Sequence, residues 1–148
     1  IPVMNPDGLA NFSRHNGHGV DLNRNMPTKD WQQNSPGEKY YSGPTAGSES
    51  ETAILMKVLH EFDPQFIVSL HSWKPMFNVN GPARTYAERM QSALNYVITE
   101  DIGYPTPGSL GTYAGWERGI PTITFEIERG LPLGQVYQTV RGALLAVV

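Results

Sequence analysis

The feature that most constrains the fold is a helical pattern over residues 49–62 that gives way directly to a β-prone run. Ser48 and Glu51, three residues apart, match a capping box at the start of this helix. Its apolar residues then recur at three- and four-residue spacing: Ile54, Leu55, Val58, Leu59 and Phe62. Pro64 ends the helix, and residues 66–70 (Phe-Ile-Val-Ser-Leu) are typical of a strand buried on both faces. Together they predict a layered α/β domain.

The later part of the chain continues the alternation of helix and strand. A second helix is predicted to start at Pro82 or Ala83, to carry apolar residues from Tyr86 to Ile98, and to close near Gly103. Three further elements are predicted: a short helix over residues 112–118, a strand over residues 121–127 and a helix over residues 133–147. This order of elements indicates helices layered on a sheet.

The first 47 residues carry turn formers and no sustained period. Residues 1–4 form a short apolar run, predicted as a buried strand, and residues 5–8 (Asn-Pro-Asp-Gly) then form a turn. Residues 9–47 are rich in Gly, Asn, Pro and Ser. A long irregular stretch inside a compact domain is typical of a loop that builds a site. Its later part, residues 31–47, is predicted as surface loop.

Composition narrows the class of partner. The 148 residues, 39% hydrophobic and 17% charged, suit one globular domain or part of one. A net charge of −3 gives no basic stripe for nucleic acid and no polybasic patch for a membrane surface. The lack of cysteine excludes disulfides, thiolate chemistry and cysteine-ligated metal, and leaves the compartment open between cytoplasm and periplasm. Because Ile1 lies inside an expected strand, we expect the chain to start part-way through its domain.

Three short segments carry residues suited to chemistry. Asn23 and Arg24 combine an amide with a planar guanidinium, which suits bidentate binding of a carboxylate, although a solvated turn has the same composition. Glu126 lies in an apolar strand, where an unpaired carboxylate is costly and is therefore partnered or functional. Glu128 is predicted to point to the same face and is the alternative to it. His71 follows a strand, where a lone histidine is more often structural than a metal ligand.

Five segments carry a family resemblance: residues 5–8 (Asn-Pro-Asp-Gly), 14–16 (Arg-His-Asn), 19–25 (Gly-Val-Asp-Leu-Asn-Arg-Asn), 69–73 (Ser-Leu-His-Ser-Trp) and 124–126 (Thr-Phe-Glu). Taken in this order, they resemble the zinc carboxypeptidase family, the carboxypeptidase A-like metallopeptidases. The resemblance implies a three-layer α/β fold, with a mixed, mostly parallel, twisted sheet and helices on both faces. It also implies that residues 1–148 form a single catalytic domain, here its C-terminal two thirds.

The resemblance implies a role for each matching residue. Glu126 is the general base and then the general acid, which takes a proton from a metal-bound water and passes it to the leaving amine. Arg14 polarises the scissile carbonyl and stabilises the oxyanion. Asn23 and Arg24 bind the terminal carboxylate of the substrate, and His71 is the third zinc ligand. The implied enzyme is a hydrolase.

Three further assignments follow from the resemblance. Asp21 matches an outer-shell carboxylate that orients the first zinc histidine, and without that histidine we expect Asp21 to take a different partner. Tyr104 matches the mobile tyrosine that closes over substrate, with Tyr113 as the alternative. A cis peptide bond is implied between Ser72 and Trp73, directly after the ligand histidine.

The sequence departs from the family at the zinc site. The family binds one zinc with two histidines and a glutamate, and leaves the fourth position to water. Its first two ligands come from a His-x-x-Glu segment before the Asn-Pro-Asp-Gly turn, and no such segment occurs in this chain. We therefore expect one zinc per chain, with two further ligands upstream of Ile1. His15 and His18 are predicted as solvated loop histidines, because the charge of nearby Arg14 opposes a cation.

The resemblance implies a peptide substrate with a free C-terminal carboxylate. The loop of residues 103–109, with Gly111, is similar to that of the bacterial murein peptide amidase branch, which cleaves the amide between γ-D-glutamate and meso-diaminopimelate in murein tripeptides. Candidates to read the extra amino and carboxyl groups of diaminopimelate are Tyr113, Glu117 and Glu128. The alternatives are a general carboxypeptidase, a deacylase of small N-acyl amino acids and a non-catalytic carboxylate-binding relic. Glu126, which binding alone does not need, favours an enzyme.

Overall fold

The computed structural model describes residues 1–148, and the chain divides into two compact units. Unit 1 comprises residues 1–64 and 106–113, and unit 2 comprises residues 65–105 and 114–148. The π-helix η2, Gly111–Trp116, lies where the chain passes from unit 1 to unit 2, close to the short helix predicted over residues 112–118. No helix has both the length and the apolar character needed to span a membrane. The expectation of a single domain stays a prediction.

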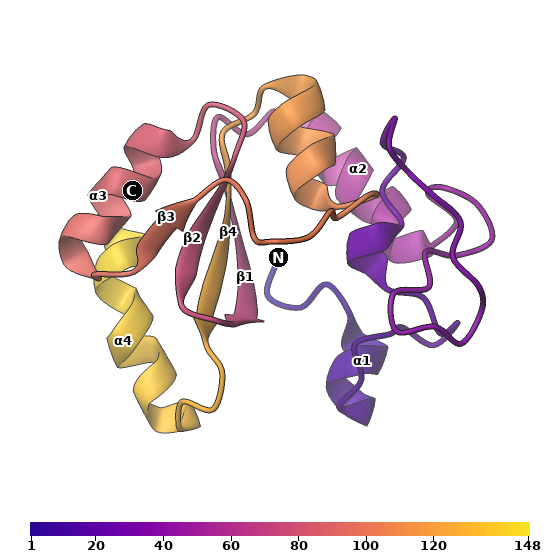
Figure 1. Cartoon of the computed structure of the whole chain (residues 1–148), viewed down its shortest axis with the longest axis horizontal. Helices are drawn as coiled ribbons and strands as arrows, with labels where there is room; N and C mark the ends of the chain where they lie inside the picture. The colour runs from indigo at the N-terminus through magenta and orange to yellow at the C-terminus, as the bar shows by residue number, and fades with distance from the viewer. The chain divides into compact units, whose positions relative to one another are not determined.

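Unit 2 is built on an open four-stranded sheet with the strand order β1-β4-β2-β3 (Figure 1). The strands are β1 Ile67–Trp73, β2 Met76–Asn80, β3 Val97–Thr99 and β4 Thr122–Glu128. β1 is parallel to β4 and β2 is parallel to β3, whereas β2 and β4 are antiparallel. The predicted α/β class, with a mixed and mostly parallel sheet, is confirmed.

Two helices of unit 2, α3 Arg84–Ala93 and α4 Leu133–Leu145, lie together beside β2 and β3 (Figure 1). The buried side chains that join them to the sheet are Phe77, Val79, Ala87, Met90, Ile123, Phe125, Ile127, Val140 and Ala143. Along β4, Ile123 and Phe125 point into this core, so the alternating residues Thr124 and Glu126 point to the opposite face. The sheet therefore has one apolar face toward the helices and one face that carries polar side chains.

Unit 1 consists mainly of loops around three helical segments: α1 Pro6–Asn11, the 3₁₀-helix η1 Leu22–Arg24 and α2 Ser50–Phe62. Asn5 caps α1, because its side-chain oxygen accepts a hydrogen bond from the backbone N–H of Gly8 at 2.8 Å. Pro6 suits the first position of the helix, where its missing N–H has no intrahelical partner to lose. The long irregular stretch predicted over residues 9–47 is confirmed, with η1 as its main interruption.

Three predictions for the N-terminal part are wrong. Residues 1–4 form no strand, because no strand of the sheet pairs with them, and Ile1 is 67% exposed. Residues 5–8 begin α1 and do not form an isolated turn. The capping box between Ser48 and Glu51 is not formed: Glu49 is the N-cap residue of α2, and the Ser48 hydroxyl donates to the Glu49 side chain at 2.6 Å.

The strand predicted over residues 66–70 is confirmed as β1, but two of its expected properties are wrong. β1 is an edge strand that pairs with β4 alone, and it leaves Leu70 54% exposed where burial on both faces was expected. The backbone contains no cis peptide bond. Ser72 and Trp73 therefore join in the trans form, and both continue the extended ladder of β1 against Ile127 and Glu128.

The predicted second helix is too long. α3 ends at Ala93, well before Gly103, because residues 97–99 (Val-Ile-Thr) extend and pair with β2 as β3. These three residues are β-branched and pack well on a pleated sheet. The helices predicted over residues 49–62 and 133–147 are confirmed as α2 and α4, and the strand over residues 121–127 is confirmed as β4.

Candidate active site

His71 and Glu126 are register partners on neighbouring parallel strands of unit 2. Register partners of a parallel ladder point to the same face of a sheet, and adjacent strands lie about 4.8 Å apart. Because Phe125 is buried in the apolar core, Glu126 lies on the polar face, and His71 lies on it as well. The Oε2 atom of the Glu126 carboxylate is shielded from solvent. A histidine and a carboxylate thus stand side by side on the same face.

The imidazole of His71 is held by a residue of its own strand. The Ser69 hydroxyl lies 3.0 Å from Nε2 of His71, and both side chains occupy the polar face of β1. A histidine that binds a metal through one ring nitrogen usually holds the other in a hydrogen bond, which fixes the orientation of the ring. The Ser69 hydroxyl provides such a hydrogen bond at Nε2 of His71. The flanking serine was part of the sequence motif, but its bond to the ring was not predicted.

In unit 1, η1 presents Asn23 and Arg24 next to each other. Asp21 caps η1 by accepting a hydrogen bond from the N–H of Asn23 at 3.1 Å. The side-chain oxygen of Asn23 accepts from the N–H of Leu110 at 2.9 Å, so its Nδ2 donor lies at the other end of the amide. Arg24 is 4% exposed, and its Nη1 donates to the carbonyl of Asn23 at 2.7 Å. The two side chains form a fixed set of N–H donors suited to an anion.

Gly108, in the loop of residues 103–109, supports this pair of donors. Its φ is +70°, and a Cβ at this position would collide with the carbonyl oxygen of Arg24. Its own carbonyl accepts a hydrogen bond from the N–H of Met26 at 2.9 Å. Only glycine fits here, because it alone combines this conformation with such a close backbone approach. Sequence reasoning did not connect Gly108 with Arg24.

Arg14 and Asp21 form an ion pair within unit 1. The Nε atom of Arg14 lies 2.6 Å from Oδ2 of Asp21, whose side chain is almost fully buried. Asp21 was expected to find a partner other than a zinc histidine in this chain, and Arg14 is that partner. The second oxygen of Asp21 caps η1, so one carboxylate ties Arg14 to the segment that carries Asn23 and Arg24.

Tyr40 lies against both arginines of unit 1. The Cζ atoms of Arg14 and Arg24 are each 5.0 Å from the centroid of the Tyr40 ring, within cation–π range. A hydrogen bond from the Lys39 side chain lowers the pKa of the Tyr40 phenol. Burial opposes this shift, and the charges of Lys39, Arg14 and Arg24 add to it. Sequence analysis placed Tyr40 in a surface loop and gave it no role.

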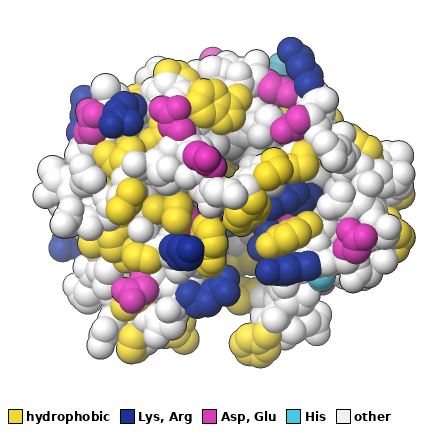
Figure 2. Space-filling model, viewed as in Figure 1, with side chains coloured by type: hydrophobic (Ala, Val, Ile, Leu, Met, Phe, Trp, Pro, Cys, Tyr) yellow, Lys and Arg dark blue, Asp and Glu magenta, His cyan; other side chains and the backbone are white.

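Figure 2 shows basic and hydrophobic side chains interleaved on the molecular surface.

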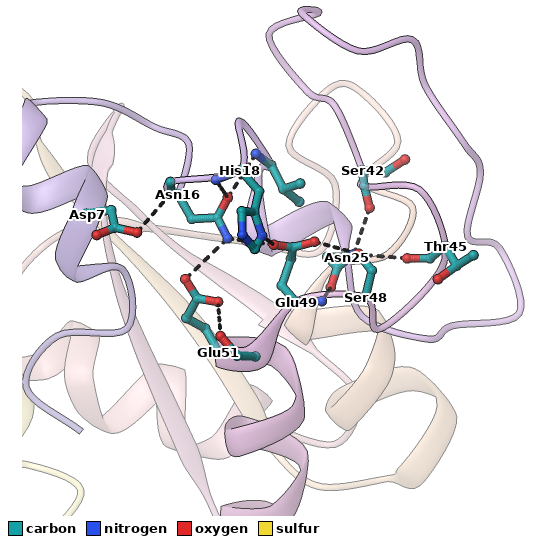
Figure 3. Close-up of polar contacts among 12 residues, drawn as sticks. Asp7, Asn16, His18, Asn25, Ser42, Thr45, Ser48, Glu49 and Glu51 are labelled. Atoms are coloured by element: carbon teal, nitrogen blue, oxygen red, sulfur yellow. Dashed lines mark hydrogen bonds and ion pairs between the residues drawn. The ribbon is translucent and has the colours of Figure 1, made fainter.

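A buried polar network fixes the loops around η1 to the start of α2 (Figure 3). The Glu49 carboxylate accepts hydrogen bonds from Nδ2 of Asn16 at 2.8 Å and from the Ser48 hydroxyl at 2.6 Å, and it pairs with Nδ1 of His18 at 2.8 Å. Asn25, directly after Arg24, donates to the Ser48 hydroxyl at 3.0 Å. His18 is exposed as predicted, but it is an ion-pair partner and not a merely solvated residue.

We expect this ion pair to make stability depend on pH. The hydrogen bond to Glu49 and its charge raise the pKa of His18 above 6.5. Burial opposes ionisation of Glu49, but hydrogen bonds from Ser48, Asn16 and His18 outweigh it and lower its pKa below 4.5. The His18 contribution is complete below pH 6.5 and is lost as pH rises through the raised pKa. The Glu49 contribution is complete above pH 4.5 and is lost as pH falls through the lowered pKa.

Urea unfolding at about pH 5.5 and at about pH 9 measures the loss of stability that His18 should cause as pH rises. The unfolding free energy of the native protein should fall slightly between the two values, because the His18 ring is largely exposed and its ion pair is weak. His18→Gln, which cannot be protonated, should remove that fall. An equal fall in both proteins would show that His18 is not its source.

Tyr104 and Trp73 meet in unit 2 close to His71. Their rings are 5.8 Å apart in an edge-to-face arrangement, and Trp73 is two residues beyond His71 on the same face of β1. Tyr104 is 41% exposed, whereas Tyr113 is buried. An exposed ring suits a residue that moves over substrate, so Tyr104 remains the stronger candidate.

The candidate residues therefore form two groups. Unit 1 positions four of them through η1 and its contacts: Arg14, Asp21, Asn23 and Arg24. Unit 2 positions the other three on or beside the polar face of the sheet: His71, Tyr104 and Glu126. In unit 1, Asp21 joins Arg14 to η1, and in unit 2, His71 and Glu126 are register partners. The role of each residue stays a prediction.

The sequence profile of the zinc carboxypeptidase family matches residues 1–118. The chain belongs to this family. It is 34% identical over 125 residues to murein peptide amidase A of Escherichia coli K12, an alignment that covers 76% of this chain and 51% of that protein. It is 33% identical over 139 residues to murein peptide amidase A of Vibrio campbellii, covering 86% of this chain and 55% of that protein. The chain spans about half the length of these relatives.

Solved structures of zinc carboxypeptidases share this fold. The murein-tripeptide amidase MpaA of Escherichia coli O157 superposes with a TM-score of 0.84 at 27% identity, over 100% of this chain and 67% of that one. Carboxypeptidase A of Helicoverpa armigera superposes with a TM-score of 0.83 at 19% identity, over 99% of this chain and 48% of that one. At 19% identity, the likeness to carboxypeptidase A shows a shared fold alone.

Membership of the zinc carboxypeptidase family implies zinc, which takes three protein ligands in catalytic sites of this kind. His71 is the candidate ligand that this chain places beside Glu126. The structure contains no group of three or more histidine, cysteine, aspartate or glutamate side chains that could hold a metal ion. The residues of this chain therefore do not complete a zinc site by themselves.

Proposed function

We propose that this chain forms the substrate-binding and proton-transferring part of a zinc-dependent peptidase. This peptidase hydrolyses the amide next to a C-terminal residue, and its substrate is the bond between γ-D-glutamate and meso-diaminopimelate in murein peptides. The observation that carries the proposal is the pairing of His71 with Glu126 on one polar face of the sheet. The names of the relatives, murein peptide amidase A and murein-tripeptide amidase, support the choice of substrate.

The basic residues of unit 1 suit the anionic parts of such a substrate. Arg24 and Asn23 present N–H donors from a rigid helical turn, and charge-assisted hydrogen bonds of this kind hold a carboxylate firmly. Arg14 provides a fixed cation for the oxyanion that forms at the scissile carbonyl. The ion pair with Asp21 restricts the Arg14 side chain, so less reorganisation is needed when the charge develops.

Glu126 suits proton transfer at the scissile bond. Its carboxylate stands beside His71 on the polar face of the sheet, and the Oε2 atom is shielded from solvent. We assign it the proton taken from the attacking water and returned to the leaving amine. His71 contributes one zinc ligand in this proposal, and two further ligands come from residues upstream of Ile1.

The test is a substrate panel with the full natural protein that contains this chain. We expect release of meso-diaminopimelate from L-Ala-γ-D-Glu-meso-diaminopimelate with kcat/KM at least about tenfold above that for blocked dipeptides or N-acetyl amino acids. A chelator should abolish this activity and zinc should restore it. A protein that prefers a blocked dipeptide would be a general carboxypeptidase, and the murein substrate would be wrong. Zinc-loaded protein that hydrolyses none of them would show a carboxylate-binding relic.

A further inference from the structure

Tyr40 is the residue that links the two arginines of unit 1. Its ring centroid lies 5.0 Å from Cζ of Arg14 and 5.0 Å from Cζ of Arg24. Arg14 is held at Nε by Asp21, and Arg24 is held at Nη1 by the carbonyl of Asn23. Each guanidinium is therefore held within unit 1 by a hydrogen bond and also lies near the same aromatic ring. Nothing in the sequence motifs assigns Tyr40 a part in the site.

Hydrogen bonds to residues elsewhere in unit 1 fix the backbone around Tyr40. The carbonyl of Lys39 lies 2.9 Å from Nε2 of His15, and the carbonyl of Tyr40 accepts from Nδ2 of Asn34 at 3.0 Å. The carbonyl of Tyr41 accepts from the N–H of Asp21 at 2.8 Å. Residues 39–41 thus form a strap. The hydrogen bond at Tyr41 joins this strap to Asp21, which pairs with Arg14. The position of the ring is set by the strap and not by the ring's own contacts alone.

We infer that Tyr40 is a positioning residue that holds the guanidinium groups of Arg14 and Arg24 in the orientation that an anionic substrate needs. The inference rests on the proposed function. Two guanidinium groups near one ring repel each other, and the negative face of the ring offsets part of this repulsion. The ring carries no formal charge, so it orients the cations without neutralising them. An ion-pair partner in its place would compete with the substrate for the same donors.

The inference separates the ring from the phenol hydroxyl. Tyr40→Phe keeps the ring and should change kcat/KM by less than about twofold. Tyr40→Leu removes the ring and should raise KM for the tripeptide by about three- to tenfold, the factor that one cation–π contact is worth. The same variant should lose less on an analogue whose C-terminal carboxylate is an amide. A general loss of folding would affect the acid and the amide alike.

A second measurement does not depend on activity. The side-chain Nε–Hε signals of Arg14 and Arg24 in ¹H–¹⁵N NMR spectra of the protein report the nearby ring directly. Both signals should shift in Tyr40→Leu and stay close to their native positions in Tyr40→Phe. If Tyr40→Leu does not fold, Tyr40→Gln, which also lacks a ring, replaces it in both experiments.

Two results would overturn the inference. The first is an unchanged pair of arginine signals in the variant without a ring. The second is an equal loss in Tyr40→Phe and Tyr40→Leu, which would assign the effect to the phenol hydroxyl. A native protein that hydrolyses none of the substrates would refute the proposed function, while the arginine signals would still decide whether Tyr40 positions the two side chains.

Discussion

Replacing Glu126 with glutamine is expected to lower kcat by about 10²–10⁴-fold, the range that general acid–base catalysis contributes. Glutamine has nearly the same shape and still forms hydrogen bonds, but it cannot take a proton from water. The KM should change little, because the carboxylate of the substrate is assigned to Asn23 and Arg24. Steady-state kinetics with the murein tripeptide, on zinc-loaded full-length protein, measure both constants.

Glu128→Gln is the matched control for this variant. Glu128 lies two residues beyond Glu126 on the same face of β4, but it is exposed to solvent. Its replacement should leave kcat close to the native value and alter only the KM for the tripeptide, through the amino group of diaminopimelate. A large loss of kcat in Glu128→Gln, with activity retained in Glu126→Gln, would exchange the two assignments.

The elements that were predictable are those whose pattern is local. The helical spacing of α2 and α4 and the apolar run of β4 depend on residues within one element, so the sequence alone indicates them. The strand β1 was predicted for the same reason. Its place at the edge of the sheet was not, because it depends on which strands pair with it.

The error over α3 and β3 has a similar cause. Tyr86, Met90 and Leu94 continue into Val97 and Ile98 at spacings that also suit a helix. The chain leaves the helix because Val97 and Ile98 pair with Met76 and Phe77 of β2. This pairing joins residues that are far apart in the sequence, and tertiary contacts of this kind commonly override local propensity.

The candidate site shows the same division. Residues inside short motifs were found from the sequence, and the structure places Asn23 beside Arg24 and His71 beside Glu126. Tyr40 and Gly108 were missed, because each acts through contact with a residue elsewhere in the chain. No spacing or residue type marks such a contact in a single sequence.

Replacing Arg24 with glutamine is expected to raise KM for a peptide acid by about 10²-fold or more. A hydrogen bond to a charged group contributes about 1.5–3 kcal/mol, and a bidentate arginine supplies two. Arg24→Lys keeps the charge but loses the planar fork, and should fall between the native protein and Arg24→Gln. The corresponding peptide amide, which has no carboxylate to bind, should show little change in either variant. Equal losses on acid and amide would make Arg24 a structural residue.

The Arg24 variant also tests how Tyr40 acts. If the ring acts partly by orienting Arg24, removing the ring should cost less once Arg24 is glutamine, because one of the two cations that it orients is gone. The double variant Arg24→Gln with Tyr40→Leu should therefore lose less affinity for the peptide acid than the two single losses predict together. Residues in contact deviate from additivity by about 0.5–3 kcal/mol, whereas independent sites add within about 0.5 kcal/mol. Strict additivity would show that Tyr40 and Arg24 contribute separately, and the effect of Tyr40 would then pass through Arg14 alone.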